Sequence, residues 1–491
     1  MALRARGKPF VVVGDALLDR DLDGRAERLA PDAPVPVVDD PTERPRPGGA
    51  ALAATLASLL DGREVVLVTA LARDEPGVVL RELLELAGVA VVDLGLAGPT
   101  AEKIRIRAGG RPLLRLDRGA RPGRPGPLDD AGRRAIAGAA AVLVADYGRG
   151  VAAEPGVRAA LAGRPARTPL VWDPHPKGPA AVPGARLATP NRAEAERFVP
   201  EVAGEGLATV TARARVLAER WAAAGVAVTL GPGGALLVAG AGAPLVVPAP
   251  AARGGDPCGA GDRFAAAAAG LLADGALPSE AVVGAVAAAS SFVAAGGAAA
   301  VRLPERPPGP AGGGPTGPPA RGSAGSTPGG TAVPHGGAVE RALAVIERVR
   351  AEGGTVVATG GCFDLLHAGH VATLRAARAL GDCLVVCLNS DDSVRRLKGH
   401  DRPLVPEADR VAVLEAIGCV DAVVPFDERT PEAVLARLRP DVFAKGGDYA
   451  LADLPEAAVL ATWGGQAVVL PYLEGRSTTD LMKEVVRRDS G

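Results

Sequence analysis

The sequence has few aromatic residues, few cysteines and almost no net charge. Tryptophan, tyrosine and phenylalanine make up 3% of the 491 residues, so the cores must be built mainly from valine, leucine and alanine. The five cysteines are scattered, odd in number and without paired metal-ligand spacing, which excludes a disulfide-stapled secreted protein. Basic and acidic residues number 55 and 56, so composition gives no reason to expect nucleic acid or an anionic membrane as a partner.

The sequence also lacks a recognisable export signal. The apolar run at residues 10–13 is ended by Gly14 and Asp15, which makes it far too short for a signal peptide. Residues 281–301 carry no charge and are long enough to cross a bilayer, but they are mostly alanine, glycine and serine. They therefore predict a buried helix near a ligand site, and we expect a cytoplasmic protein without a membrane partner.

The length and one biased segment predict two folded domains. A chain of 491 residues exceeds one ordinary core. Residues 304–337 are rich in proline, glycine, serine and threonine with hardly any large apolar side chain, a composition that cannot bury enough surface to fold. We expect a first domain at 1–303, a disordered linker at 304–337 and a second domain at 338–491.

The first domain has the pattern of an α/β protein. Short apolar runs at residues 10–13, 65–68, 89–92, 141–144, 170–172 and 226–230 alternate with helix-length stretches, which predicts parallel βαβ units. Residues 100–107 and 113–117 alternate with period two and predict a hairpin around Gly109-Gly110. One of its faces carries Lys103, Arg105 and Arg107, either as a solvated surface or as a site for a sugar phosphate.

Polar and glycine-rich segments follow several of these strands. Asp15 and Asp19 follow the first strand, where carboxylates suit the hydroxyl groups of a ligand, although a solvated turn is equally compatible. Gly48-Gly49 opens a helix and would let a ligand approach the backbone. Asn191 and Glu194 can orient hydrated Mg²⁺ and phosphates, form an ordinary capping box, or do both.

The strongest feature of the first domain is residues 254–264, a glycine-rich turn that leads into an alanine-rich helix. The amides of Gly259, Ala260 and Gly261 would point at one spot at the helix start, with Asp262 within reach of it. Such an anion hole beside a general base suits a kinase, because the aspartate takes the proton of a hydroxyl while the amides stabilise the migrating phosphoryl group. A capped helix after a flexible turn is the structural alternative.

The motif Asp-x-x-Gly-Ala-Gly-Asp at 256–262 resembles the signature of the ribokinase-like (PfkB) carbohydrate kinases, over roughly residues 8–303. The resemblance implies a doubly wound domain with a small β lid and Asp262 as the base. For ATP and Mg²⁺ it implies Asn191, Glu194, Gly231, Gly233, Gly234 and Asp256. For the sugar it implies Asp15, Asp19, Gly48, Gly49, Lys103, Arg105 and Asp117. Two departures are Leu52, where relatives commonly have asparagine, and Pro257-Cys258 in place of a threonine-containing pair.

The second domain is organised around residues 360–370, Gly-Gly-Cys-Phe-Asp-Leu-Leu-His-Ala-Gly-His, between a β-branched run and a helical pattern. His367 and His370 are three residues apart and can meet one phosphate at a helix start, although a metal pair or a solvated face has the same spacing. Because the intervening residues are small, the segment favours a catalytic turn.

This motif resembles that of the nucleotidyltransferases related to cytidylyltransferases, which join a nucleoside monophosphate to a phosphorylated acceptor. The resemblance implies a Rossmann-like domain in which the two histidines stabilise phosphate charge during in-line attack and no protein nucleophile is needed. Basic residues at 395–402 form either a solvated loop or a phosphate site. Further candidates for nucleotide and acceptor are Gly361, Phe363, Asp364, Lys398, Arg402, Arg410, Lys445, Ser477, Thr478 and Thr479.

The order of the two halves resembles the bifunctional kinase and adenylyltransferase enzymes of ADP-heptose biosynthesis. This implies ATP-dependent, Mg²⁺-dependent phosphorylation of D-glycero-β-D-manno-heptose 7-phosphate at O1, removal of the 7-phosphate by a separate phosphatase, and adenylyl transfer to heptose 1-phosphate. No residue is assigned as a direct metal ligand. Another sugar kinase fused to a cytidylyltransferase, or a non-catalytic sugar-nucleotide sensor, would carry similar motifs. The oligomeric state, homo-oligomer included, is not readable from the sequence.

Overall fold

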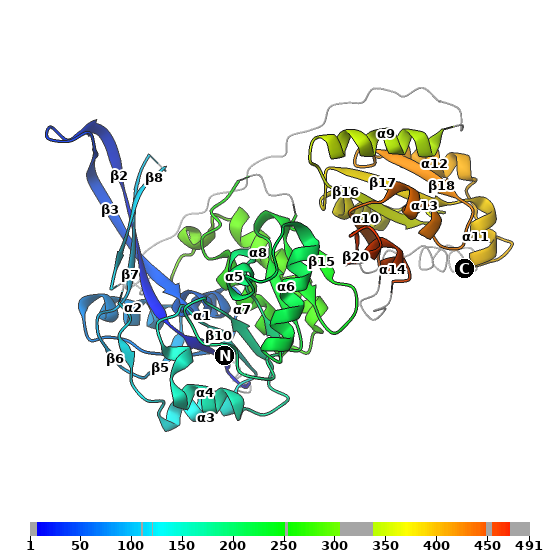
Figure 1. The fold of residues 1–491 in the computed structure, drawn as a ribbon. Coiled ribbons are helices and arrows are strands. Elements are labelled where there is room, and N and C mark those ends of the chain that lie inside the picture. Colours follow the sequence, from blue (N-terminus) through cyan, green and yellow to red (C-terminus); the bar gives the residue numbers. More distant parts are fainter. Residues whose placement is uncertain are drawn as a thin grey trace, which may run out of the picture. The chain divides into compact units, whose positions relative to one another are not determined.

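The computed structural model describes residues 7–109, 111–119, 121–250, 254–304, 337–447 and 454–471. The chain divides into two compact units. The first consists of residues 1–241 and 247–304, and the second of residues 305–491 and 242–246. Both are α/β units built on parallel sheets (Figure 1), as the sequence predicts.

The first unit is built on a sheet with the strand order β14-β13-β12-β11-β10-β1-β4-β5. All neighbours in it are parallel except β13 and β14, which pair antiparallel. Its strands are largely buried apolar runs, as a sheet covered on both faces requires, except for the edge strand β5, which is mostly partly buried or exposed. Their bounds are β1 (Phe10–Gly14), β4 (Val65–Thr69), β5 (Val89–Asp93), β10 (Ala141–Ala145), β11 (Leu170–Asp173), β12 (Leu187–Ala188), β13 (Val226–Thr229) and β14 (Ala235–Val238), with β15 (Leu245–Val247) next along the chain.

Helices of the first unit cover this sheet. Helices α1, α7 and α8 pack together, and α1 and α7 contact the central strands β1 and β10. The helices are α1 (Ala50–Leu59), α2 (Glu75–Leu86), α3 (Asp130–Gly138), α4 (Pro155–Ala162), α5 (Arg192–Phe198), α6 (Gly206–Arg220), α7 (Ala260–Ala273) and α8 (Pro278–Ala294), with 3-10 turns at Val151–Ala153, Gly231–Gly233 and Gly297–Ala300. The uncharged segment at 281–301 is thus largely helix α8, and none of the described helices has the length and apolar character needed to cross a membrane.

A second sheet of the first unit forms the lid, in the order β3-β2-β7-β8. Strands β2 (Ala16–Leu29) and β3 (Pro36–Gly49) form the long two-stranded ribbon drawn in blue in Figure 1, and β7 (Glu102–Ala108) and β8 (Arg111–Arg118) form the predicted hairpin. The sequence did not predict the ribbon. Its proline-rich strand β3 lies at an edge of the sheet, where missing N–H donors are tolerated. The short strands β6 (Leu96–Ala97) and β9 (Arg124–Pro125), which precede β7 and follow β8 in the sequence, pair antiparallel with each other.

The second unit has a parallel five-stranded sheet in the order β18-β17-β16-β19-β20. Helices α9, α13 and α14 share one hydrophobic cluster with its strands, which forms the core. The strands are β16 (Val356–Gly361), β17 (Cys383–Asn389), β18 (Ala422–Phe426), β19 (Val442–Gly446) and β20 (Gln466–Leu470). The helices are α9 (Ala338–Ala351), α10 (Ala368–Arg378), α11 (Asp391–Lys398), α12 (Glu407–Glu415), α13 (Glu432–Leu438) and α14 (Glu456–Ala461).

Candidate active sites

The first candidate site lies where the parallel strands of the first unit end in acidic residues. Asp15 follows β1 and is buried, and its carboxylate accepts hydrogen bonds from the backbone N–H groups of Tyr147, Arg149 and Val151 at 3.1, 2.9 and 3.0 Å. Three amide donors on one carboxylate fix its position relative to residues 147–151. Asp15 therefore orders the loop after β10, and its carboxylate is largely occupied by that loop instead of being presented to a sugar.

Asp262 lies in the first turn of α7 and is almost fully buried. The hydroxyl of Tyr147 donates a hydrogen bond to its Oδ1 at 2.6 Å. Burial raises the pKa of Asp262 to about 7, while the Tyr147 hydrogen bond and the charge of Lys103 oppose that rise. A carboxyl group with a pKa near neutrality can accept a proton in its ionised form and release it again, which is the property required of a general base.

The turn before α7 forms only part of the predicted anion hole. Gly259 has φ of 81°, a left-handed conformation that glycine adopts at little cost, and this brings the chain into the helix. The N–H of Ala260 donates to the carbonyl of Pro257 at 3.0 Å, so it closes the turn. The prediction of three convergent donors is wrong at Ala260 for this reason. Gly259 and Gly261 make no backbone hydrogen bond through their N–H groups to other described residues, and their amides remain as donors.

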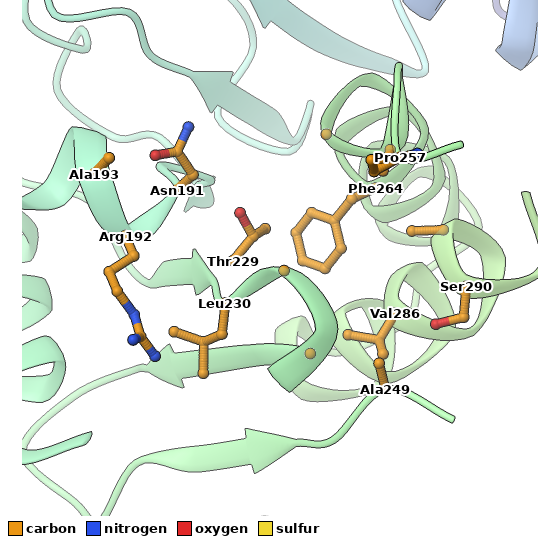
Figure 2. Close-up of a pocket in the computed structure, with 15 residues that line it drawn as sticks. Asn191, Arg192, Ala193, Thr229, Leu230, Ala249, Pro257, Phe264, Val286 and Ser290 are labelled. Atoms are coloured by element: carbon orange, nitrogen blue, oxygen red, sulfur yellow. The ribbon is translucent and has the colours of Figure 1, made fainter. Parts of the chain in front are cut away.

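A pocket of about 460 Å³ adjoins this helix start (Figure 2). Gly231 and Gly234, from a second glycine-rich turn at residues 231–234 between β13 and β14, line it, as do Ala260 and Gly261 of α7. Figure 2 shows Phe264 of α7 pointing into the same space, with Thr229 and Leu230 on the adjacent side. Gly233 belongs to the same turn but is not among the lining residues. The pocket therefore joins two segments that the sequence assigned to ATP.

Asn191 and Glu194 form a complete capping box at the start of α5. The side chain of Asn191 accepts from the N–H of Glu194 at 2.9 Å, and Glu194 Oε2 accepts from the N–H of Asn191 at 2.8 Å. Asn191 lines the pocket as well. The structural reading of this pair is thus confirmed, and its position beside the pocket keeps the second reading open.

The lid contributes a buried charge network. Arg46 of β3 contacts the carboxylates of Asp19 and Asp21 at 2.9 and 2.8 Å, and Arg105 of β7 lies 3.3 Å from Asp19. The Cβ of any larger residue at Gly48 would lie 3.0 Å from the Asp19 carboxylate, which explains the glycine. Asp19 is therefore paired with two arginines, and the sequence had not singled out Arg46.

Other lid residues differ in how far they reach toward the site. Nζ of Lys103 lies 5.1 Å from the centre of the Tyr147 ring, and its pKa is lowered mainly by burial. Asp117 on β8 lies opposite Lys103 in the strand register, but it is exposed and pairs with Arg115 at 2.7 Å.

Two further predicted residues lie at the start of α1 and in the turn before α7. At Gly49, the N-cap of α1, φ is 60°. Asp256 accepts from the N–H of Cys258 at 3.0 Å and lies 3.3 Å from Arg107.

The second candidate site surrounds the turn between β16 and α10. His367 is the N-cap of α10, and its Nδ1 accepts from the N–H of Gly369 at 3.1 Å. The rings of His367 and His370 lie 4.0 Å apart between centroids, and Phe363 packs 5.4 Å from His370. Burial, followed by the neighbouring His367, lowers the pKa of His370 to about 4. The two predicted histidines are therefore together, with His370 neutral at pH 7.

The acidic residue of this turn organises the loop after α11. Asp364 is buried, pairs with Arg402, and accepts from the N–H groups of Leu404 and Val405 at 2.6 and 3.1 Å. These donors hold the pKa of Asp364 below its ordinary value against the effect of burial. Lys398 ends α11, and its charge contributes to lowering the pKa of His370. Gly361 is the last residue of β16. Phe363 lies in the turn that follows and has a φ of 46°, in the left-handed region.

The structure corrects the role predicted for Arg410. Its side chain is 1% exposed, and its guanidinium donates to the carbonyls of Val405, Cys362 and Asn389 at 2.7–2.9 Å and to Asp391 at 2.6 Å. A guanidinium with its donors used in this way is not available to a phosphate. Arg410 instead joins the ends of β16 and β17 through Cys362 and Asn389. These contacts fix the start of the turn that carries His367 and His370.

The remaining candidates of the second unit fall into two groups. Lys445, on β19, donates to Glu456 of α14 at 2.9 Å while its side chain stays partly exposed. Ser477, Thr478 and Thr479 lie outside the described residues. Among the residues that are described, no group of three or more His, Cys, Asp or Glu side chains could hold a metal ion.

Comparison with known proteins decides the family. Residues 8–306 match the model of the pfkB family of carbohydrate kinases, and residues 358–481 match the cytidylyltransferase-like model. The bifunctional protein HldE of Streptomyces coelicolor is 58% identical over 98% of this chain and 97% of its own. The chain belongs to the HldE family. HldE proteins of Halorhodospira halophila and Azorhizobium caulinodans are 39% and 38% identical over 97% and 96% of this chain, each covered to 97%.

Membership of the HldE family confirms that the chain is an enzyme with a carbohydrate kinase half and a nucleotidyltransferase half. The structure also shows where the two departures from the kinase pattern, at Leu52 and at Pro257-Cys258, lie. Leu52 is buried in a small cluster with Leu56, Phe292 and Ala298, against which Cys258 packs. A Cβ at Gly259 would lie 2.8 Å from Leu52. In this HldE chain, Leu52 therefore supports the turn before Asp262 through apolar packing.

Sequence reasoning missed Tyr147 and Glu456 in this HldE chain, and it missed Arg46 as well. Tyr147 lies in the segment Asp-Tyr-Gly-Arg-Gly at 146–150, directly after a buried strand, which is a position that often carries function in α/β sheets. Glu456 is a buried carboxylate whose Oε2 has no hydrogen-bond partner among the described residues. Nothing in its local sequence distinguishes it from an ordinary acidic residue in the first turn of a helix.

Proposed function

We propose that the chain carries out two steps of ADP-heptose synthesis. The first unit transfers the γ-phosphoryl group of ATP to O1 of D-glycero-β-D-manno-heptose 7-phosphate. The second unit joins the adenylyl group of another ATP to heptose 1-phosphate and releases pyrophosphate. The observation that carries the proposal is Asp262, a buried carboxyl with a pKa of about 7 at the start of α7, beside a pocket lined by the glycine-rich turn.

In the kinase step, Asp262 takes the proton of the O1 hydroxyl as that oxygen bonds to the γ-phosphorus of ATP. The bond between the γ-phosphorus and the β,γ-bridging oxygen breaks, and ADP leaves. The amides of Gly259 and Gly261, at the positive end of α7, stabilise the charge that develops on the phosphoryl oxygens. ATP fits the pocket formed by Gly231 and Gly234 together with Phe264.

The 7-phosphate of the sugar is assigned to the lid. Lys103 has no ion pair among the described residues and points its ammonium group over the Tyr147 ring, so its charge is available to a phosphate. Arg105 is already partly compensated by Asp19 at 3.3 Å and takes the supporting role. Gly48 and Gly49 bring the backbone close to the sugar hydroxyls, with Asp15 and Asp19 behind them.

A hydrated Mg²⁺ fits the residues beside the pocket. Asn191 Oδ1 and Glu194 Oε2 are used in the capping box, which leaves Glu194 Oε1 to hold a water of the ion. Mg²⁺ keeps several waters and binds through few protein oxygens, so this donor set suits it. When bound with ATP, the ion supplies neutralising charge at the β- and γ-phosphates.

In the second unit, the acceptor phosphate of heptose 1-phosphate attacks the α-phosphorus of ATP, and the bond to the pyrophosphate oxygen breaks. His367 and His370 donate hydrogen bonds to the phosphate oxygens, and Lys398, Arg402 and Lys445 supply positive charge around them. Ser477, Thr478 and Thr479 are proposed to hold the β- and γ-phosphates. Since the kinase product still carries its 7-phosphate, a separate phosphatase must act between the two steps.

The decisive experiment measures ADP release from ATP with purified protein and heptose 7-phosphate, and in separate reactions with other sugar phosphates. Pyrophosphate release is measured in parallel with heptose 1-phosphate and either ATP or CTP. We expect ADP release with heptose 7-phosphate and pyrophosphate release with ATP. Activity on an unrelated sugar alone, or with CTP alone, would replace the substrate assignment while leaving the two reaction classes.

The reactions use cytoplasmic nucleotides, and we assign the protein to the cytoplasm.

A further inference from the structure

Tyr147 forms a hydrogen bond with Asp262, the proposed general base. Its hydroxyl donates to Asp262 Oδ1 at 2.6 Å, a distance typical of a charge-assisted hydrogen bond from a hydroxyl to a carboxylate. Burial raises the pKa of Tyr147 well above its ordinary value, so the hydroxyl keeps its proton at every pH at which the enzyme would work. Tyr147 is therefore a permanent donor to Asp262.

The backbone around Tyr147 is fixed from the opposite side. Asp15 accepts the N–H groups of Tyr147, Arg149 and Val151, and Asp146 Oδ1 accepts the N–H of Gly148 at 2.8 Å. Four backbone donors in five consecutive residues are thus bound to two buried carboxylates. This loop cannot easily move, and the phenol ring it carries has one defined position.

We propose that Tyr147 is a positioning residue for phosphoryl transfer, which holds Asp262 Oδ1 so that Oδ2 faces the acceptor hydroxyl. Oδ2 makes no hydrogen bond to any described residue, so it is the oxygen left to receive the proton. The inference rests on the proposed kinase step of the same site. It adds a residue and a role that the motif at 256–262 does not contain.

The charged surroundings of Asp262 define what loss of the hydroxyl should do. Lys103 of the lid strand β7 and Arg46 of β3 favour the ionised form, whereas Asp19 of β2 opposes it, and Asp173 of β11 is close enough for its own pKa to be raised by Asp262. Tyr147 is the largest of the influences that keep the Asp262 pKa from rising further. Removing it should raise that pKa.

Lys103 also gives the ring of Tyr147 a separate role. Its Nζ lies 5.1 Å from the ring centre, within the range of a cation–π contact. The hydroxyl therefore holds the base, while the ring face meets a lid residue that we assign to the sugar phosphate. Two variants separate these roles, because Tyr147→Phe removes only the hydroxyl and Tyr147→Leu removes both.

The test is the pH dependence of kcat/KM for ADP release, between pH 5.5 and 9, for the full-length protein and its variants. Below the Asp262 pKa of about 7 the base is protonated, so the wild-type rate falls as the pH falls. In Tyr147→Phe we expect this acid limb to move upward by about one pH unit, with KM for the sugar changed less than about twofold. In Tyr147→Leu we expect the same shift together with a raised KM.

Lys103→Met provides an independent check, because it keeps the Tyr147–Asp262 hydrogen bond and removes a charge that favours the ionised base. Its acid limb should also move upward. Pyrophosphate release by the same preparations serves as the control for intact protein and should be unchanged. An unmoved acid limb with a uniformly lower rate in Tyr147→Phe would overturn the proposal. The limb is measured with whichever sugar supports ADP release, so failure of the heptose assignment remains a separate result.

Discussion

The two candidate sites treat ionisable groups in opposite ways. In the first unit burial raises the pKa of a carboxyl group, Asp262, to about 7, and a tyrosine and a lysine hold it there. In the second unit burial lowers the pKa of His370 to about 4. The carboxylate of Asp364 there accepts backbone N–H groups of the loop after α11. The proposed reactions give a reason for this difference, because their nucleophiles differ. A sugar hydroxyl must lose a proton, whereas a phosphate is already ionised and needs only placement and charge stabilisation.

The same contrast holds for the buried arginines. Arg46 in the lid is matched by Asp19 and Asp21, so its charge is compensated within the site. Arg410 is matched by one carboxylate and three backbone carbonyls, so it acts as a connector of strand ends. A basic residue near a candidate phosphate site can thus serve the scaffold as readily as the substrate. Both arginines are buried, so the partners of the guanidinium, carboxylates for Arg46 and mainly backbone carbonyls for Arg410, distinguish the two cases.

The largest expected effect comes from removing the proposed base. Asp262→Asn keeps the size of the side chain and an acceptor for Tyr147, but it cannot take a proton at neutral pH. We expect kcat for ADP release to fall by about 10²–10⁴, with pyrophosphate release unchanged. Loss of both activities in this variant would show that the two centres depend on each other and would break the comparison.

The reciprocal variant is His370→Ala. Because His370 lies against His367 at the start of α10, its loss should remove one donor to the phosphates and lower pyrophosphate release by about 10²–10³. ADP release should stay at the wild-type rate. His400 on the loop after α11 offers a matched control, since it is exposed and His400→Ala should leave both rates within about threefold. Equal losses in the two histidine variants would refute a specific role for His370.

Replacing Arg410 tests whether its role is structural. In Arg410→Met the carbonyls of Cys362 and Asn389 lose their donor and Asp391 loses its partner. We expect the free energy of unfolding of the second unit to fall by about 2–4 kcal/mol, seen as a lower urea midpoint for pyrophosphate-releasing activity. The urea midpoint of ADP-releasing activity in the same protein is the internal reference.

The control for Arg410 is Arg395 on α11, which is exposed and, among the described residues, forms an ion pair with Asp392 alone. Arg395→Met should change stability by less than about 1 kcal/mol. A variant at Arg410 that keeps its urea midpoint but loses affinity for ATP would instead restore the direct phosphate contact that the sequence predicted.

The sequence predicts features whose parts are contiguous and fails where the parts are distant. Asp262 and its glycines lie within one helix start, and His367 and His370 lie on one turn, so local geometry suffices to find them. Tyr147 is 115 residues from Asp262, and only the order of strands β1, β10 and β11 brings it there. The burial of Arg410 likewise depends on how β16 and β17 end side by side, which no local pattern records.

The smallest expected effect compares two aspartates that the sequence placed in the same sugar site. Asp19 is buried between Arg46 and Arg105, whereas Asp117 is exposed on β8 and pairs with Arg115. Since exposed ion pairs contribute about 0–1 kcal/mol, Asp117→Asn should change stability by less than about 1 kcal/mol and kcat/KM for ADP release by less than about threefold. Asp19→Asn leaves two arginines undercompensated and should reduce kcat/KM far more. If instead Asp117→Asn raises KM for the sugar phosphate as strongly as Asp19→Asn does, the outer strand of the lid belongs to the binding site and the buried network alone does not define it.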